Sequence, residues 1–172
     1  MRDGDVGATT DAVIGHLEQS GARSAWDAVF MAAAEVILGS DTALFDTTHA
    51  LTGAVAAKHA YASSPTASTR LISLVVAAGR VTERYARLPT SLDLTTLAAT
   101  PGATIAEVFS SLESSPTTAA QALIGYLGAG GSRQAFLAHA RANMLSRANN
   151  IHDIKYPEAV FATPTNLPSD WS

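Results

Sequence analysis

The stretch SAWDAVFMAAAEVILG, residues 24–39, decides the fold class of this chain. Its apolar residues recur at spacings of three and four, as they do on one face of an amphipathic helix. The residues of this face are Trp26, Val29, Phe30, Ala33, Val36 and Ile37. Ser24 with Asp27 resembles a capping box at its start, and Gly39 ends it. We therefore expect a helix here that contributes to the core.

The same pattern extends outward in both directions. It predicts a short helix from Thr10 to Gly21, and further helices near 43–61, 67–87, 104–114, 118–127, 133–148 and 152–161. In the helix near 67–87 the residues expected to face inward are Leu71, Leu74, Val75, Ala78, Val81 and Tyr85. Alternation with a period of two is nowhere sustained. The sequence thus predicts an all-α fold, an irregular bundle of about eight short helices.

The length of the chain and the positions of its proline and glycine residues suggest how it is divided into domain, loop and tail. At 172 residues it fits a single all-helical domain over 1–172. Residues 88–103 contain two prolines and a glycine and are expected to form a loop, and 163–172 is expected to form a Pro-rich C-terminal tail.

The composition and charge of the chain disfavour several classes of protein and partner. Apolar residues make up 47% and charged residues only 15%, against a usual 25% or so, which disfavours disorder. The net charge of -4 disfavours nucleic acid, and no apolar run is long enough for a membrane span. Without an apolar segment after Met1 a signal peptide is not expected, and the expected location is cytoplasmic. A high apolar fraction with little charge predicts a homodimer or a complex with a partner chain.

The segment LGAGGS, residues 127–132, resembles a nucleotide-binding loop only superficially. Such a loop follows a strand, whereas this one follows a predicted helix and lacks the lysine of a P-loop. We expect a helix end at the glycines and a new helix start at Ser132.

His49 is the first candidate metal ligand. Asp46 precedes it by three residues and Gly53 follows by four, so the three share one helix face with open space above the imidazole. Asp46 would then accept a hydrogen bond from the second ring nitrogen of a metal-bound His49. The alternative is a half-buried histidine bonded to Asp46 without a metal. Glu35 either marks the solvent face of its helix or reaches the metal.

The last helix carries the second candidate group. His152, Lys155 and Tyr156 share one face, and Lys155 is one of only two lysines, the other being Lys58. The alternative is a short amphipathic helix whose lysine reaches solvent. The doublet His152-Asp153 also occurs in metal-dependent phosphohydrolases, but the only carboxylates that follow it are Glu158 and Asp170, which disfavours that function.

Two motifs carry a resemblance to a known family. The stretch NIHDIKYPEAV, residues 150–160, resembles the His-x-x-Lys-[aromatic or Leu] motif near the end of the questin oxidase-like family. His49-Ala50-Leu51-Thr52 is similar to that family's His-[Ala/Leu]-[Val/Leu]-Thr segment, in the same order and at a similar separation. The resemblance implies oxidation of an aromatic polyketide or quinone with dioxygen by an oxidoreductase that uses non-haem iron. It makes His49 and His152 ligands of Fe(II), and Lys155, carboxylated by carbon dioxide, a third.

The chain departs from that family in length. Family members are generally more than twice as long, and their N-terminal half carries further histidines. A partner chain could supply the missing ligands, or His16, His59 or His139 could replace them. The other possibility is a non-catalytic helical subunit or interaction module with a residual His-x-x-Lys pair. The sequence therefore predicts either an iron-dependent oxygenase, or a subunit of one, or an interaction module.

Overall fold

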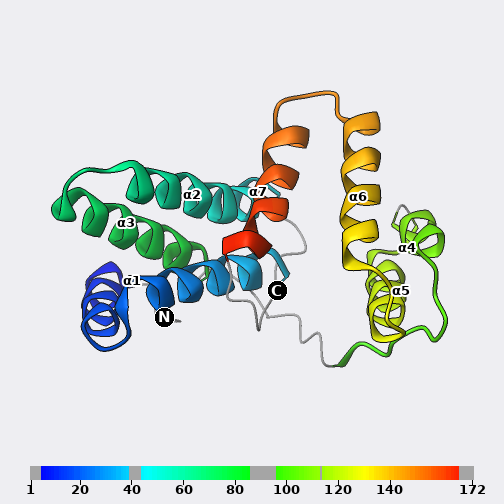
Figure 1. Cartoon of the computed structure of the whole chain (residues 1–172), viewed down its shortest axis with the longest axis horizontal. Helices are drawn as coiled ribbons and strands as arrows, with labels where there is room; N and C mark the ends of the chain where they lie inside the picture. The colour runs from blue at the N-terminus through cyan, green and yellow to red at the C-terminus, as the bar shows by residue number, and fades with distance from the viewer. Residues whose placement is uncertain (1–4, 39–43, 86–95, 113, 167–172) are drawn as a thin grey trace. The chain divides into compact units, whose positions relative to one another are not determined.

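The computed structural model describes residues 5–38, 44–85, 96–112 and 114–166, and over these residues it contains seven helices and no strand (Figure 1). The helices are α1 (Val6–Leu38), α2 (Leu44–Ser63), α3 (Ala67–Tyr85), α4 (Ile105–Ser111), α5 (Pro116–Gly128), α6 (Arg133–Arg147) and α7 (His152–Asn166). The predicted all-α class is confirmed. The count is one lower than expected because the first two predicted helices form the single element α1.

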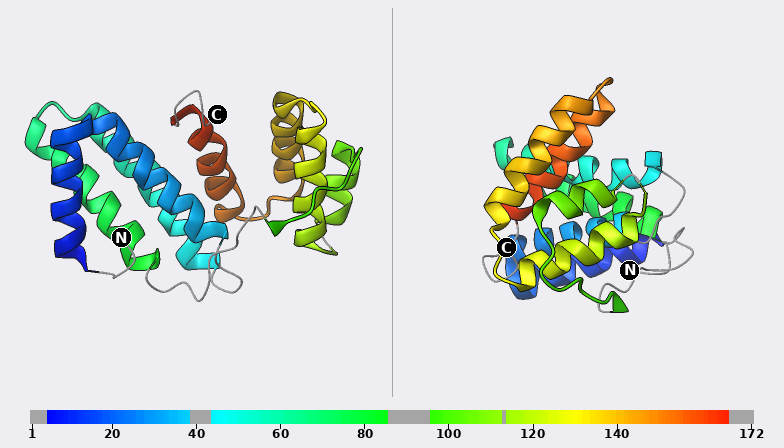
Figure 2. Two further views of the ribbon diagram at one scale, coloured as in Figure 1. Left: turned by 90° about the horizontal axis from the view of Figure 1, so that it is seen from below. Right: turned by 90° about the vertical axis from the view of Figure 1, so that its right-hand side faces the viewer.

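The two predicted helices in α1 are nevertheless separated by a sharp kink. Gly21 has φ 79° and ψ 170°, a conformation that only glycine adopts without strain. The two halves of α1 run in different directions in Figure 2. Ser24, predicted as a helix cap, instead shares a 2.8 Å hydrogen bond between its hydroxyl and Nε2 of His16 across the kink. The predicted break at Gly21 is confirmed.

Contacts group the chain into two compact units. The first unit comprises 1–92 and 155–172, with α1, α2, α3 and most of α7, and the second comprises 93–154, with α4, α5 and α6. The prediction of a single domain stays a prediction, because neither unit is shown to fold by itself.

The core of the first unit forms where α3 packs against both α1 and α2 (Figure 1). Trp26, Phe30 and Ala33 are fully buried, Val29 and Val36 are almost so, and Ile37 is partly buried against the core, which confirms the predicted inner face. Other elements supply further buried core residues, which include Leu51, Ala54, Leu74, Ala78, Val81 and Ala159. One prediction for α3 is wrong: Leu71 is 41% exposed, because neither α1 nor α2 covers its side of the helix.

The second unit is organised by helix caps. Thr104 and Glu107 form a reciprocal capping box at the start of α4, and this bonding lowers the pKa of the Glu107 carboxyl. Gly130 has φ 83° after α5, and the Ser132 hydroxyl accepts a hydrogen bond from Ala135 N at the start of α6. The segment at residues 127–132 is therefore the predicted connection between two helices.

The C-terminal helix is longer than expected. α7 continues through Pro157 to Asn166, so its last turn includes residues assigned to the Pro-rich tail. Ala159 and Phe161 are buried, and this burial stabilises the helix beyond the proline. Part of the predicted loop, residues 88–95, lies outside the described residues, as do Asp170 and the rest of 167–172. No helix within the described ranges is long and apolar enough to cross a membrane.

Candidate functional site

His49 lies in the second turn of α2 and is half-buried, with its Nδ1 atom shielded from solvent. Its neighbours Thr48, Ala50 and Leu51 are buried. A Cβ atom placed on Gly53, one turn further along, would meet nothing within 4 Å, so the expected open space is present. The side chain of Asp46, the candidate partner of the imidazole, lies outside the described residues.

The second predicted ligand group fits its role less well. Lys155 is exposed, so its side chain reaches solvent and does not lie in a buried site. Tyr156 is half-buried, and burial raises the pKa of its phenol. The side chains of His152 and Asp153 lie outside the described residues. The exposed lysine agrees with the alternative of an amphipathic helix whose lysine reaches solvent.

The other candidate ligands have separate surroundings. His16 is hydrogen-bonded to Ser24, His59 is exposed on α2, and the ring of His139 contacts that of Phe109 in the second unit, with centroids 4.9 Å apart and planes tilted by 38°. Glu35 accepts a 2.5 Å hydrogen bond from the hydroxyl of Tyr85, which joins α1 to α3. Among the described side chains no group of three or more His, Cys, Asp or Glu residues could hold a metal ion. The iron site of His49, His152 and Lys155 stays a prediction.

The structure brings together a cluster that sequence reasoning missed. Nζ of Lys58 on α2 lies 4.9 Å from the ring centroid of Trp26 on α1 and 5.6 Å from that of Tyr61. The two rings meet edge to face, with centroids 5.5 Å apart and planes at 77°. The only signals in the sequence were the rarity of lysine and the spacing of three between Lys58 and Tyr61.

Burial and the nearby charges have opposing effects on the pKa of Lys58. Partial burial lowers the pKa of Lys58, the charge of Arg23 lowers it further, and the Asp27 carboxylate counteracts both. Oδ1 of Asp27 and Nε1 of Trp26 are both buried, and neither has a hydrogen-bond partner among the described residues. The amine of Lys58 thus lies over aromatic rings of α1 and α2, within the electrostatic influence of Asp27 and Arg23.

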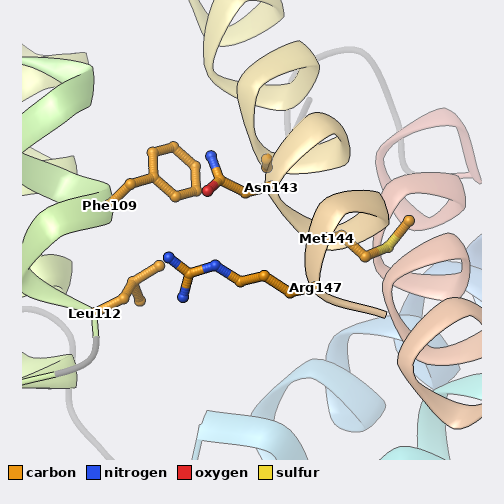
Figure 3. A pocket seen from close by; sticks show the side chains of 6 residues that line it. Phe109, Leu112, Asn143, Met144 and Arg147 are labelled. Atoms are coloured by element: carbon orange, nitrogen blue, oxygen red, sulfur yellow. The ribbon is translucent and has the colours of Figure 1, made fainter. Parts of the chain in front are cut away.

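The second unit has a pocket of about 240 Å³ between α4 and α6 (Figure 3). Phe109 and Leu112 line one side, and Asn143 and Arg147 extend from α6 on the other. The lining is mostly apolar, with one guanidinium group. No motif in the sequence indicated this pocket.

An apolar surface covers the N-terminal half of α3. Ile72 is 61% exposed, Val76 is 52% exposed and Leu71 is 41% exposed, while Val75 beside them is half-buried. We call these four residues the α3 face. Spacings of one, four and five place them along one side of the helix, and the face carries no charged group.

We compared the chain with protein family models, with curated proteins and with solved structures, and none of the three comparisons found a match. The resemblance to the questin oxidase-like family therefore stays a prediction that rests on the motif residues quoted for it.

Proposed function

We propose that this chain is a non-catalytic helical subunit that assembles with a second copy of itself through the α3 face. The observation that carries the proposal is the exposure of Ile72 and Val76, two large aliphatic side chains one turn apart on a helix whose opposite side is core. Clusters of this kind mark surfaces that a partner covers. The low charge and high apolar fraction of the chain agree with such a role.

The α3 face is self-complementary in an antiparallel pair. About a two-fold axis between positions 72 and 76, Ile72 packs on Val76 of the partner subunit, and the same contact occurs a second time by symmetry. Arg80, which is exposed beyond the face, then lies opposite the small Ser68 of the partner subunit. A parallel pair would instead bring the two Arg80 side chains together, and like charges oppose this arrangement. We therefore choose the antiparallel dimer.

Substitution of Ile72 by aspartate tests the proposed interface. Because the substitution occurs twice in a symmetric dimer, and each carboxylate would lose water on association, we expect affinity to fall about a hundredfold or more. Light scattering should then report a monomer at concentrations where the wild type is a dimer. The matched control is Leu145→Asp, since Leu145 is 64% exposed on α6 and lies off the α3 face.

The two variants separate assembly from folding. Both should keep the helical circular dichroism of the wild type, because both positions are exposed. If Ile72→Asp leaves the mass unchanged, or if Leu145→Asp disrupts the dimer equally, the α3 face is not the interface.

A second candidate function is the iron-dependent oxygenase, an oxidoreductase acting on an aromatic polyketide or quinone. The observation in its favour is His49, whose imidazole is half-buried one turn before Gly53, where an added Cβ atom would meet nothing within 4 Å. Against it, Lys155 is exposed, and the described residues do not bring three ligands together.

Metal content decides between the two functions. The oxygenase predicts stoichiometric iron after anaerobic loading with Fe(II), and its loss in His49→Ala, His152→Ala and Lys155→Arg. A subunit without catalytic function predicts no retained iron in any of the four proteins. The measurement is elemental analysis after gel filtration, with Glu18→Gln as the control, because Glu18 is exposed on α1 and is not a predicted ligand.

A further inference from the structure

We propose that the pocket between α4 and α6 binds a small carboxylic acid that carries a single aromatic ring. All the residues that line this pocket belong to the second unit. The apolar walls take the ring, and the guanidinium group of Arg147 binds the carboxylate. This inference does not depend on the dimer or on the iron site.

The size of the pocket fits one ring. Its volume is about 240 Å³, whereas a cavity of about 150 Å³ already holds benzene. The remaining space accommodates a carboxylate on a short linker, but it does not accommodate a fused system of three rings.

Phe109 supplies an aromatic wall. Its ring stacks on that of Phe136 with centroids 5.5 Å apart, and it contacts the ring of His139. A ligand ring in the pocket adds a further member to this aromatic group, and aromatic pairs are more stable than their buried area alone would give. Leu112 and Met144 complete the apolar lining, and because Leu112 is 46% exposed, a bound ring removes apolar surface from water.

The charge around the pocket favours an anion. Arg147 extends from α6 toward α4, and its planar guanidinium group matches a carboxylate in a bidentate pair (Figure 3). α6 carries two further arginines and no acidic residue. On α4 the carboxylate of Glu107 is hydrogen-bonded to N and Oγ1 of Thr104 in the capping box. The ligand that suits this surface is therefore negatively charged.

Phenylacetate is the probe, and the backbone amide signals of the intact chain in two-dimensional NMR are the measurement. We expect saturable shifts at residues 105–112 and 136–147, with a dissociation constant of about 1 mM. Two comparison compounds separate the parts of the ligand. Phenylacetamide keeps the ring without the charge, and hexanoate keeps the charge without the ring, so each should bind about fivefold more weakly.

Three variants connect this binding to the pocket. Arg147→Gln should weaken phenylacetate about fivefold and leave phenylacetamide unchanged, because only the carboxylate pairs with the guanidinium group. The matched control is Arg141→Gln on the same helix, since Arg141 is exposed and does not line the pocket, and it should change the affinity less than about twofold. Ala140→Phe should abolish binding, because the larger side chain fills the pocket.

Four results would overturn the proposal. The first is the absence of saturable shifts up to about 10 mM phenylacetate. The second is equal affinity for phenylacetate and either comparison compound, a test that needs only the wild-type chain. The others are equal losses of affinity in Arg147→Gln and Arg141→Gln, and unchanged binding in Ala140→Phe.

Discussion

Trp26→Ala is expected to lower the free energy of unfolding of the first unit by about 3–5 kcal/mol, the usual cost of removing a fully buried aromatic side chain. Trp26 has no exposed surface, and its ring contacts Phe30 at a centroid distance of 6.1 Å and Tyr61 at 5.5 Å. Its removal leaves a cavity where α1 meets α2 and takes away the ring under Lys58.

Urea denaturation followed by circular dichroism measures this loss. The control is Ile14→Ala on the same helix, where the side chain is 38% exposed and the expected change is less than about 1 kcal/mol. Equal effects of the two substitutions would mean that Trp26 does not hold α1 and α2 together.

Gly125→Ala is expected to disrupt the second unit. A Cβ atom at this position would lie 1.8 Å from the carbonyl oxygen of Thr100 and 2.7 Å from its carbon, so the backbone itself must move. The segment is held there by a 3.0 Å hydrogen bond from Thr100 N to the carbonyl of Gln121. We expect destabilisation at or above the upper end of the range of about 1–3 kcal/mol that overpacking costs, together with loss of this contact between α5 and residues 100–103.

The matched control is Gly128→Ala, three residues along the same helix. A Cβ atom there meets nothing within 4 Å, and alanine favours helix over glycine by up to about 1 kcal/mol. The two substitutions are chemically identical, yet Gly125→Ala should lower the unfolding midpoint and Gly128→Ala should keep or raise it. Amide hydrogen exchange at residues 100–128 locates the change, and equal midpoints for the two variants would contradict the close approach of Thr100.

The sequence was most informative where local chemistry decides the structure. Four correct predictions depend on residues that are close together in the chain. They are the helix starts at Ser132 and near Thr104, the break at Gly21 and the inner face around Trp26. It was less informative at the end of α7, which continues to Asn166 although the sequence predicted an end at residue 161, because the packing of Ala159 in the core depends on distant residues.

The candidate site was harder to predict from the sequence, because it too depends on residues that are far apart in the chain. His49 was found by its place on a helix face, but the cluster of Lys58 with Trp26 brings together positions 32 residues apart. The exposure of Ile72 depends on which side of α3 the neighbouring helices cover, and helical spacing alone does not reveal that. Helical periodicity placed Leu71 on the inner face of this helix, and only packing shows that its side is exposed.

Sedimentation equilibrium of the wild-type chain tests the central claim most directly. The chain has a mass of 17.8 kDa. Assembly through the α3 face predicts a reversible association toward twice that mass as the concentration rises, with no larger species, because an isologous interface closes on itself. A constant mass of 17.8 kDa at every concentration up to the solubility limit would contradict it.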